Sequence, residues 1–245
     1  RIQVDVLAMT ATPIPRTLYL ALMGARPMSN IDTPPFERLP VTTIVAEEDL
    51  RLIKEAIRKE LDRSGQVFVI FPWIGGIGKI HQRISELVPQ ARLVAVHGQM
   101  PSKSLEQAML RFMRHEADVL VSTAIVESGI DIPNANTILV FRADTFGLAD
   151  LYQLRGRVGR FTRQAYALFL TPKGIPLTAE ARKRLKAVEE FSSLGAGFQI
   201  ALEDLQLRGA GNLLGTEQHG HIMAVGFDLY CRQLKSEIDK LKRKW

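Results

Sequence analysis

Between residues 41 and 170, short apolar runs alternate with segments of helical periodicity, and this alternation constrains the fold more than any other feature. The apolar residues Leu50, Ile53, Ile57 and Leu61 fall on one helical face, and Gly65 ends that segment. The runs at 41–45, 66–71, 92–96, 118–123, 137–141 and 165–170 predict strands, and the segments 50–61, 79–87, 101–114 and 148–154 predict helices. This order predicts an α/β domain with a mainly parallel sheet and helices on both faces.

The flanking segments have a different character. Pro34 and Pro35 disfavour a helix and predict an extended linker before a domain that starts near residue 41. Residues 1–9 resemble part of a buried strand, so we expect the chain to be a piece of a longer one. After residue 172 we expect a second unit: a charged helix at 179–194, a glycine-rich loop around 209–220 and a helix at 229–245 that is cut short.

Composition excludes several classes of protein. With 46% hydrophobic and 24% charged residues the chain is neither disordered nor collagen-like, and it lacks the run of about 20 apolar residues that a membrane span needs. Cys231 is the only cysteine, which excludes an internal disulfide and favours a reducing, cytoplasmic setting. His219 and His221 lack helical metal-pair spacing and a carboxylate cluster, so we expect no metal site. The net charge of +6 is compatible with an anionic partner but does not establish one.

The segment 75–80 resembles a phosphate loop but does not match one. That motif needs a glycine five positions before its Gly-Lys pair and a Ser or Thr after it, whereas Trp73 and Ile80 stand there. The dinucleotide-binding pattern fails as well, and no acidic pair that could hold Mg²⁺ follows an apolar strand. We therefore expect a turn into a helix. The aromatic residues of 68–73 are expected in the core, with Trp73 the candidate for stacking on bases.

The octet at 153–160, Gln-Leu-Arg-Gly-Arg-Val-Gly-Arg, carries the strongest chemical signal. Arg157 and Arg160 can present planar guanidinium groups to phosphate oxygens, and such an arginine can stabilise the charge of a transferred γ-phosphoryl group. The alternative is a solvated basic segment with glycines for close packing. Gln153, both glycines and both arginines fit one pattern together, which favours the functional interpretation.

That pattern, QxxGRxGR, resembles motif VI of superfamily 2 helicases and translocases. Residues 10–13 resemble motif III and residues 121–133 resemble motif V, in the expected order. Segments 12–17, 97–100, 142–149 and 207–211 resemble the family of bacterial transcription-repair coupling factors, with RecG the nearest sibling. The resemblance implies the end of a first RecA-like motor domain and a linker at 1–35, a second motor domain at 36–172, a translocation module of helical hairpin and loop at 173–228, and a truncated helix at 229–245.

The resemblance also implies residue roles. Arg160 would act as the arginine finger, with Arg157 and Gln153 supporting it. The remaining roles would be nucleotide contact by Gly129 and Asp131, contact with a DNA phosphate by Thr123, and coupling of ATP hydrolysis to movement by Thr10, Thr12, Arg184, Arg208 and Gln218. Taken singly, these residues have ordinary interpretations: a turn aspartate, a strand threonine, a solvated helix arginine. Asn212 stands where the family pattern has a glutamate, which removes a charge and puts an ion pair there in doubt.

The expected function is that of part of an ATP-driven double-stranded DNA translocase of transcription-coupled repair, which would displace stalled RNA polymerase. ATP with Mg²⁺ would be bound mainly by the first motor domain, and RNA polymerase and nucleotide-excision-repair proteins would bind domains outside this sequence. Because the sequence lacks the phosphate loop, we expect no ATP hydrolysis from these 245 residues alone. The alternatives are a RecG-like fork-remodelling helicase and a non-catalytic DNA-binding or regulatory module.

Overall fold

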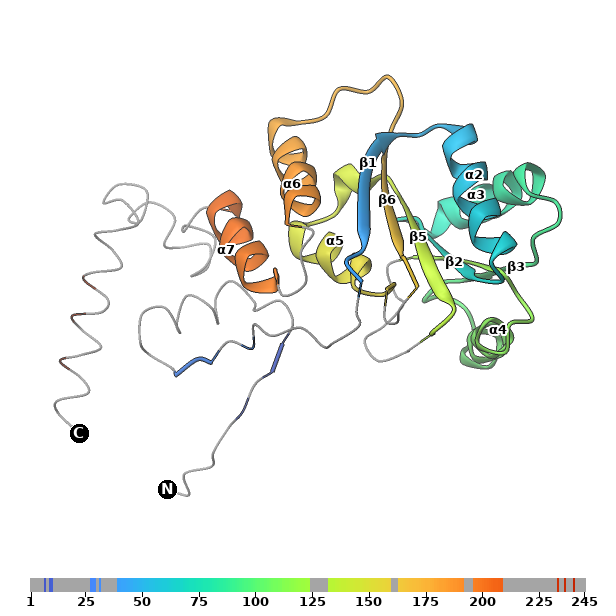
Figure 1. Ribbon diagram of the computed structural model, residues 1–245, viewed down its shortest axis with the longest axis horizontal. Helices are drawn as coiled ribbons and strands as arrows, with labels where there is room; N and C mark the ends of the chain where they lie inside the picture. Colours follow the sequence, from blue (N-terminus) through green and yellow to red (C-terminus); the bar gives the residue numbers. More distant parts are fainter. Residues whose placement is uncertain are drawn as a thin grey trace. The chain divides into compact units, whose positions relative to one another are not determined.

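A sheet of six parallel strands forms the centre of the domain, in the order β1-β6-β5-β2-β4-β3 (Figure 1). The computed structural model describes residues 39–123, 132–159, 163–191 and 196–208, together with residues 7, 9, 10, 27–29, 31, 233, 236 and 240. The strands are β1 (Thr42–Glu47), β2 (Gln66–Ile70), β3 (Leu93–Val96), β4 (Val119–Ser122), β5 (Ala135–Phe141) and β6 (Tyr166–Thr171). Strands β2 and β5 are central and buried throughout, as their uninterrupted apolar runs predict.

The helices are α2 (Leu50–Asp62), α3 (Ile74–Leu87), α4 (Ser102–Met113), α5 (Leu148–Arg155), α6 (Ala179–Glu190) and α7 (Gly197–Arg208), with a 3₁₀ turn, η1, at Ala143–Thr145. Helix α2 begins where the Asp49 carboxylate accepts a hydrogen bond from the amide of Arg51, and α6 begins where Thr178 caps the amide of Ala181. Among the described residues, no helix is long and apolar enough to cross a membrane.

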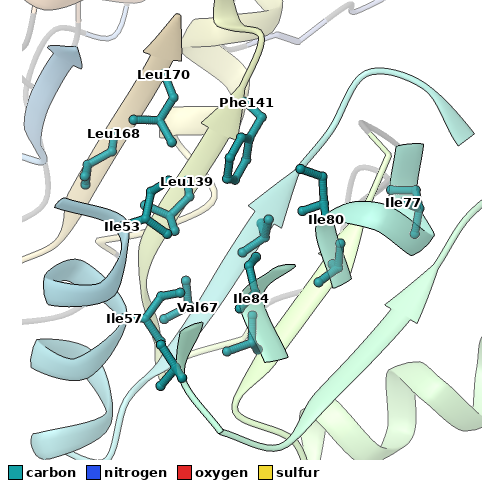
Figure 2. Close-up of a cluster of buried hydrophobic side chains, with 14 residues drawn as sticks. Ile53, Ile57, Val67, Ile77, Ile80, Ile84, Leu139, Phe141, Leu168 and Leu170 are labelled. Atoms are coloured by element: carbon teal, nitrogen blue, oxygen red, sulfur yellow. The ribbon is translucent and has the colours of Figure 1, made fainter. Parts of the chain in front are cut away.

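Helices cover both faces of the sheet. On one face, Ile53 and Ile57 of α2 and Ile77, Ile80 and Ile84 of α3 form a buried cluster with inward-pointing strand residues such as Val67 and Leu139 (Figure 2). On the other face, Phe68 of β2 contacts Phe112 of α4, with ring centroids 5.4 Å apart. Helices α5 and α6 lie on the side of the sheet opposite α2 and α3 (Figure 1). The predicted parallel sheet with helices on both faces is therefore confirmed.

Helix α3 starts five residues earlier than the sequence predicted, so Gly75, Gly76 and Gly78 lie inside it instead of in a turn. Gly76 is required there for packing. A Cβ atom at this position would lie 2.0 Å from the ring of Phe71. The helix tolerates these glycines because its Ile77, Ile80 and Ile84 are buried against the sheet, and burial of that face outweighs their low helical propensity.

The chain divides into two units by its internal contacts, 34–194 and the combination of 1–33 with 195–245. Helix α6, which the sequence assigned to a module beginning at residue 173, packs against α5, η1 and β1 within the first unit. The domain boundaries at 35, 172 and 228 stay predictions. The described part of the second unit consists of α7 and isolated residues, and the glycine-rich loop at 209–220 lies outside the described residues.

Candidate functional site

The strand order creates a switch point between β2 and β5. The two strands are neighbours, but β2 continues into α3 on one face of the sheet and β5 continues into α5 on the other. In open α/β sheets, ligands bind in the crevice outside the carboxyl ends of two such strands. Trp73 follows β2 and Arg142 follows β5, and the guanidinium carbon of Arg142 lies 5.1 Å from the centroid of the Trp73 ring.

Arg142 is held in a demanding conformation at this edge. Its backbone is left-handed, with φ 50° and ψ 43°, which a residue other than glycine adopts only when its surroundings fix it. Nε and Nη2 of Arg142 donate to the Asp144 carboxylate at 3.1 and 3.0 Å, and these hydrogen bonds raise the pKa of Arg142. The Thr145 hydroxyl donates to the Arg142 carbonyl at 2.8 Å. The turn is therefore a rigid element.

Arg184, predicted to couple ATP hydrolysis to movement, lies on α6 and contacts the same turn. Its Nη2 donates to the carbonyl of Asp144 at 2.9 Å, while its buried Nε has no partner among the described residues. Arg184 thus ties α6 to the connection between β5 and α5. This position is compatible with a coupling role, which stays a prediction.

Two buried hydroxyl groups mark the carboxyl end of β4. Ser122 and Thr123 are 1% and 4% exposed, and neither hydroxyl has a partner in the part of the chain that the structure describes. The segment that follows, 124–131, contains Gly129 and Asp131 and lies outside the described residues. Contact between Thr123 and a DNA phosphate therefore stays a prediction.

The predicted phosphate-contacting residues lie at the far end of α5. Gln153 is exposed in the last turn, and Arg157 is partly exposed just after the helix, with its amide donating to the carbonyl of Leu154 at 3.1 Å. The helix starts near the carboxyl edge of the sheet and leads back to the start of β6 at the amino edge. The structure therefore separates Gln153 and Arg157 from Thr123, which lies at the opposite edge.

Arg155, the first arginine of the octet at 153–160, points into the protein. Its side chain is 5% exposed and donates to the carbonyls of Val188 and Phe191 at 2.8 and 2.7 Å. Burial lowers the pKa of Arg155 by desolvating its charge, an effect that Tyr152 partly offsets. Arg155 supplies a cation at the C-terminus of α6, whose last turn has no basic residue.

The inward direction of Arg155 was missed by sequence reasoning, although a signal existed. Leu148, Leu151 and Leu154 are the buried residues of α5, and Arg155 follows Leu148 by seven positions and Leu151 by four. These intervals place Arg155 on the buried face of the helix.

The connection after Arg157 is anchored at Gly159. Its φ of +75° suits glycine, and a Cβ atom there would lie 2.8 Å from Cγ2 of Val41 and 3.1 Å from Cβ of Ala165. Val158 is fully buried beside it.

Some of the predicted site residues lie outside the described part of the chain. These are Arg160, Thr12 and Gln218, together with the side chain of Arg208 at the end of α7. Thr10 is described and exposed. No group of three or more potential metal-ligating side chains occurs within the described ranges.

Comparison with known proteins places these features in a family. Residues 48–162 match the helicase conserved C-terminal domain. The chain is 51% identical over 237 residues to the transcription-repair-coupling factors of Staphylococcus epidermidis and Staphylococcus aureus, which covers 97% of this chain and 20% of each relative. A solved structure of RecG bound to a three-way DNA junction is 33% identical, with a TM-score of 0.70, over 91% of this chain and 30% of that one. The chain thus spans about one fifth of the length of the curated relatives it matches.

Proposed function

We propose, on the premise that the chain belongs to the transcription-repair-coupling factor family, that it forms the second motor domain and translocation module of an ATP-driven double-stranded DNA translocase. The observation that carries the proposal is the 51% identity along 97% of the chain. The whole protein would act in the cytoplasm on RNA polymerase stalled on DNA, together with nucleotide-excision-repair proteins bound by its other domains.

The geometry supports a division of labour within the domain. Gln153 is exposed in the last turn of α5, and Arg157 is partly exposed after the helix, two residues before Gly159, which packs against Val41 and Ala165 at the amino edge; an amide and a guanidinium group suit contact with phosphate oxygens. Trp73 and Arg142 lie at the opposite edge, where aromatic and cationic groups suit contact with nucleic acid, and the buried Thr123 lies at the same edge. Nucleotide and DNA would then bind different edges of one rigid sheet.

The described residues fit part of a nucleotide site. Arg157 and Gln153 could contact the phosphates of ATP, but α3 begins without the phosphate-loop sequence, and the described residues contain no cluster of potential metal ligands for Mg²⁺. ATP with Mg²⁺ would therefore be held mainly by a first motor domain. This chain would contribute Arg157 and Arg160, which would stabilise the negative charge that develops during phosphoryl transfer.

Hydrolysis of ATP by the full-length protein tests this role. With duplex DNA present, phosphate release should fall about 10³-fold or more for Arg160→Ala, since loss of an arginine finger has an effect of that size. Arg157→Ala should also lower the rate. Arg111→Ala, which removes an exposed arginine of α4, serves as the control and should retain activity. An Arg160→Ala protein with an unchanged rate would contradict the assignment.

A second experiment concerns the 245-residue chain by itself. We expect negligible phosphate release from it with duplex DNA, because it lacks a phosphate loop. Restoration of a first motor domain should restore hydrolysis. Turnover by the chain alone that disappeared in the Arg160→Ala variant would show that it carries a complete site.

Movement along DNA is tested separately from hydrolysis. In the full-length protein, Arg184→Ala, Arg208→Ala and Gln218→Ala should still split ATP but fail to displace a triplex-forming strand from duplex DNA. Normal strand displacement in any of the three variants would remove that residue from the coupling role.

The likeness to the RecG structure favours fork remodelling as the second candidate function. The two functions are distinguished by substrate. A transcription-repair-coupling factor should release RNA polymerase stalled by nucleotide omission, whereas a fork-remodelling helicase should convert a model replication fork into a four-way junction. Efficient fork conversion without polymerase release would favour the second candidate.

A further inference from the structure

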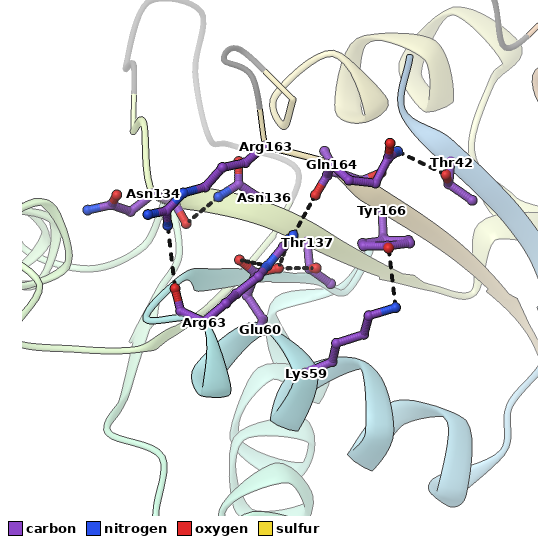
Figure 3. Close-up of polar contacts among 11 residues, drawn as sticks. Thr42, Lys59, Glu60, Arg63, Asn134, Asn136, Thr137, Arg163, Gln164 and Tyr166 are labelled. Atoms are coloured by element: carbon purple, nitrogen blue, oxygen red, sulfur yellow. Dashed lines mark hydrogen bonds and ion pairs between the residues drawn. The ribbon is translucent and has the colours of Figure 1, made fainter. Parts of the chain in front are cut away.

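The connection between α5 and β6 carries Arg157 and Arg160, and its far end is held by Arg63, the residue that follows α2. Nη1 of Arg63 donates to the backbone carbonyl of Gln164 at 2.7 Å (Figure 3). Gln164 follows Arg160 by four residues and lies just before β6. Arg63 is 101 residues away in the sequence, so the contact joins distant parts of the domain.

The Arg63 side chain is itself fixed by a buried carboxylate. Glu60 is 1% exposed and accepts hydrogen bonds from Nε and Nη2 of Arg63 and from the hydroxyl of Thr137. Gly65 leaves room for this carboxylate, since a Cβ atom at residue 65 would lie 1.7 Å from Oε1 of Glu60. A buried carboxylate needs such partners, and a two-point contact fixes the plane of the guanidinium group.

Gln164 also joins the connection to the edge strand β1. Its Nε2 donates to the hydroxyl of Thr42 at 3.0 Å (Figure 3). The same nitrogen donates to the carbonyl of Pro40 at 2.9 Å. Five residues earlier, Gly159 packs against Val41 and Ala165. The described residues on either side of 160–162 are therefore attached: Arg155 to α6, Gly159 to Val41, Arg163 to the Arg63 carbonyl, and Gln164 to both Arg63 and β1.

We propose that Arg63, oriented by Glu60, is a positioning residue that holds the connection bearing Arg157 and Arg160 in the geometry needed for ATP hydrolysis. The inference rests on the proposed function, in which these two arginines contact phosphate. Arg63 acts through the backbone at Gln164 and touches no reacting atom. The physical reason is that charge stabilisation depends on placement, and a shift of about 1 Å in a catalytic group can reduce a rate about 100-fold.

The test measures DNA-stimulated ATP hydrolysis by the full-length protein carrying Arg63→Ala. We expect kcat to fall about 10- to 100-fold with little change in KM for ATP, because a misplaced arginine stabilises the transition state less. Lys59→Ala is the matched control. Lys59 lies on α2, one turn before Arg63, and donates to the side-chain hydroxyl of Tyr166 at 3.2 Å. Because this contact is with a side chain of β6 and not with the backbone of the connection, its loss should leave kcat unchanged. Thermal unfolding of both variants checks that they are folded at the assay temperature.

A double-mutant comparison separates positioning from a general effect on the fold. If Arg63 acts through these arginines, Arg63→Ala should lower kcat strongly in the wild-type background and much less in an Arg160→Ala background, where only Arg157 is left to be misplaced. Equal loss in both backgrounds, or a kcat for Arg63→Ala equal to that of Lys59→Ala, would overturn the proposal. If Arg63→Ala does not fold, the same comparison uses Arg63→Lys, which keeps the charge but lacks the planar guanidinium group that contacts both Glu60 and the Gln164 carbonyl.

The outcomes also separate this inference from the proposed function. Absence of DNA-stimulated hydrolysis in the wild-type full-length protein would reject the proposed function, and the positioning role with it. An active wild type and an inactive Arg160→Ala protein, together with a fully active Arg63→Ala protein, would reject the positioning role alone.

Discussion

Arg142 and Trp73 stack on each other at the carboxyl ends of the neighbouring strands β5 and β2. The Trp73 ring also meets the Phe71 ring edge-on, with centroids 5.6 Å apart. Nε and Nη2 of Arg142 donate to the Asp144 carboxylate, which fixes the guanidinium group. An aromatic side chain that is 49% exposed is therefore fixed by its neighbours at the switch point of the sheet. This makes the edge a preformed surface.

The stacking contact itself should contribute measurably to stability. A double-mutant cycle of Trp73→Ala and Arg142→Ala should give a coupling free energy of about 0.5–1 kcal/mol, as expected for a partly exposed cation–π pair. Urea unfolding of the two single variants and the double variant supplies the values. The cycle cancels the separate loss of the Asp144 contact, and additive effects would show that the two side chains do not interact in solution.

Replacement of Arg155 should destabilise the domain more than replacement of any exposed arginine nearby. Arg155→Met removes the donors to the Val188 and Phe191 carbonyls, and we expect the free energy of unfolding to fall by about 2–4 kcal/mol. Arg163→Met is the control, with an expected change within about 0.5 kcal/mol because that side chain is exposed. Equal urea midpoints for the two variants would mean that Arg155 does not support α6.

The glycines of α3 should respond in opposite directions to the same substitution. Gly78→Ala places a methyl group in open space and should raise the free energy of unfolding by up to about 1 kcal/mol. Gly76→Ala should lower it, because the added Cβ meets the Phe71 ring at 2.0 Å. Urea unfolding of both variants checks the prediction, and a stabilising Gly76→Ala would show that Phe71 moves aside.

Gly159, in the connection after α5, and Gly174, in the turn after β6, are two glycines whose replacement can be compared directly. Both have positive φ, +75° and +71°, but only Gly159 has atoms close to the position of a Cβ. Gly174→Ala should destabilise by about 1–2 kcal/mol for the backbone alone, and Gly159→Ala by about 1–3 kcal/mol more for the close contact. Adding Val41→Ala to Gly159→Ala should recover part of the difference. Without such recovery in thermal or urea unfolding, Val41 is not the obstacle.

Acid should weaken the pairing of strands β3 and β4. Burial acts to raise the pKa of Asp118, but hydrogen bonds from the side chain and backbone of Arg92, together with the charges of Arg92 and His115, leave that pKa below its usual value. A lowered pKa stabilises the folded state above the unfolded pKa of about 4, and that contribution disappears as pH falls through the folded value.

Unfolding of wild type and Asp118→Asn in urea between pH 3 and pH 7 measures this dependence. The difference in free energy of unfolding between the two proteins should be constant above about pH 5 and shrink steadily below pH 4. A difference that stayed constant down to pH 3 would show that Asp118 has an ordinary pKa in the folded protein.

The fold followed from the sequence because its signals are local. The run 66–71 and the helical spacing of Ile53 and Ile57 report burial directly, so strand and helix positions agreed with the structure to within a few residues for most elements. Helix α3 was the exception. Its three glycines have low helical propensity, and the contact of Gly76 with Phe71 that accommodates them cannot be read from the sequence.

The sequence predicted which residue types form the candidate site, but not whether each side chain points into the protein or toward solvent. Arg155, Arg157 and Arg163 stand in one basic segment, yet the first is buried, the second is partly exposed and the third is exposed. The pairing of Arg63 with Gln164 depends on how α2 packs beside the start of β6, which no short motif encodes. Long-range contacts of this kind decide which cations are available to a ligand and which are used within the protein.

The contacts of α6 bring its own C-terminal end to the edge of the sheet where β1 begins. Helix α6 meets η1 near the carboxyl edge through Arg184 and ends beside Arg155, which precedes β6 at the amino edge, where β1 also begins. A circularly permuted gene, in which a short linker joins the end of α6 to the start of β1 and new termini open at the exposed Gly174, should therefore encode the same fold.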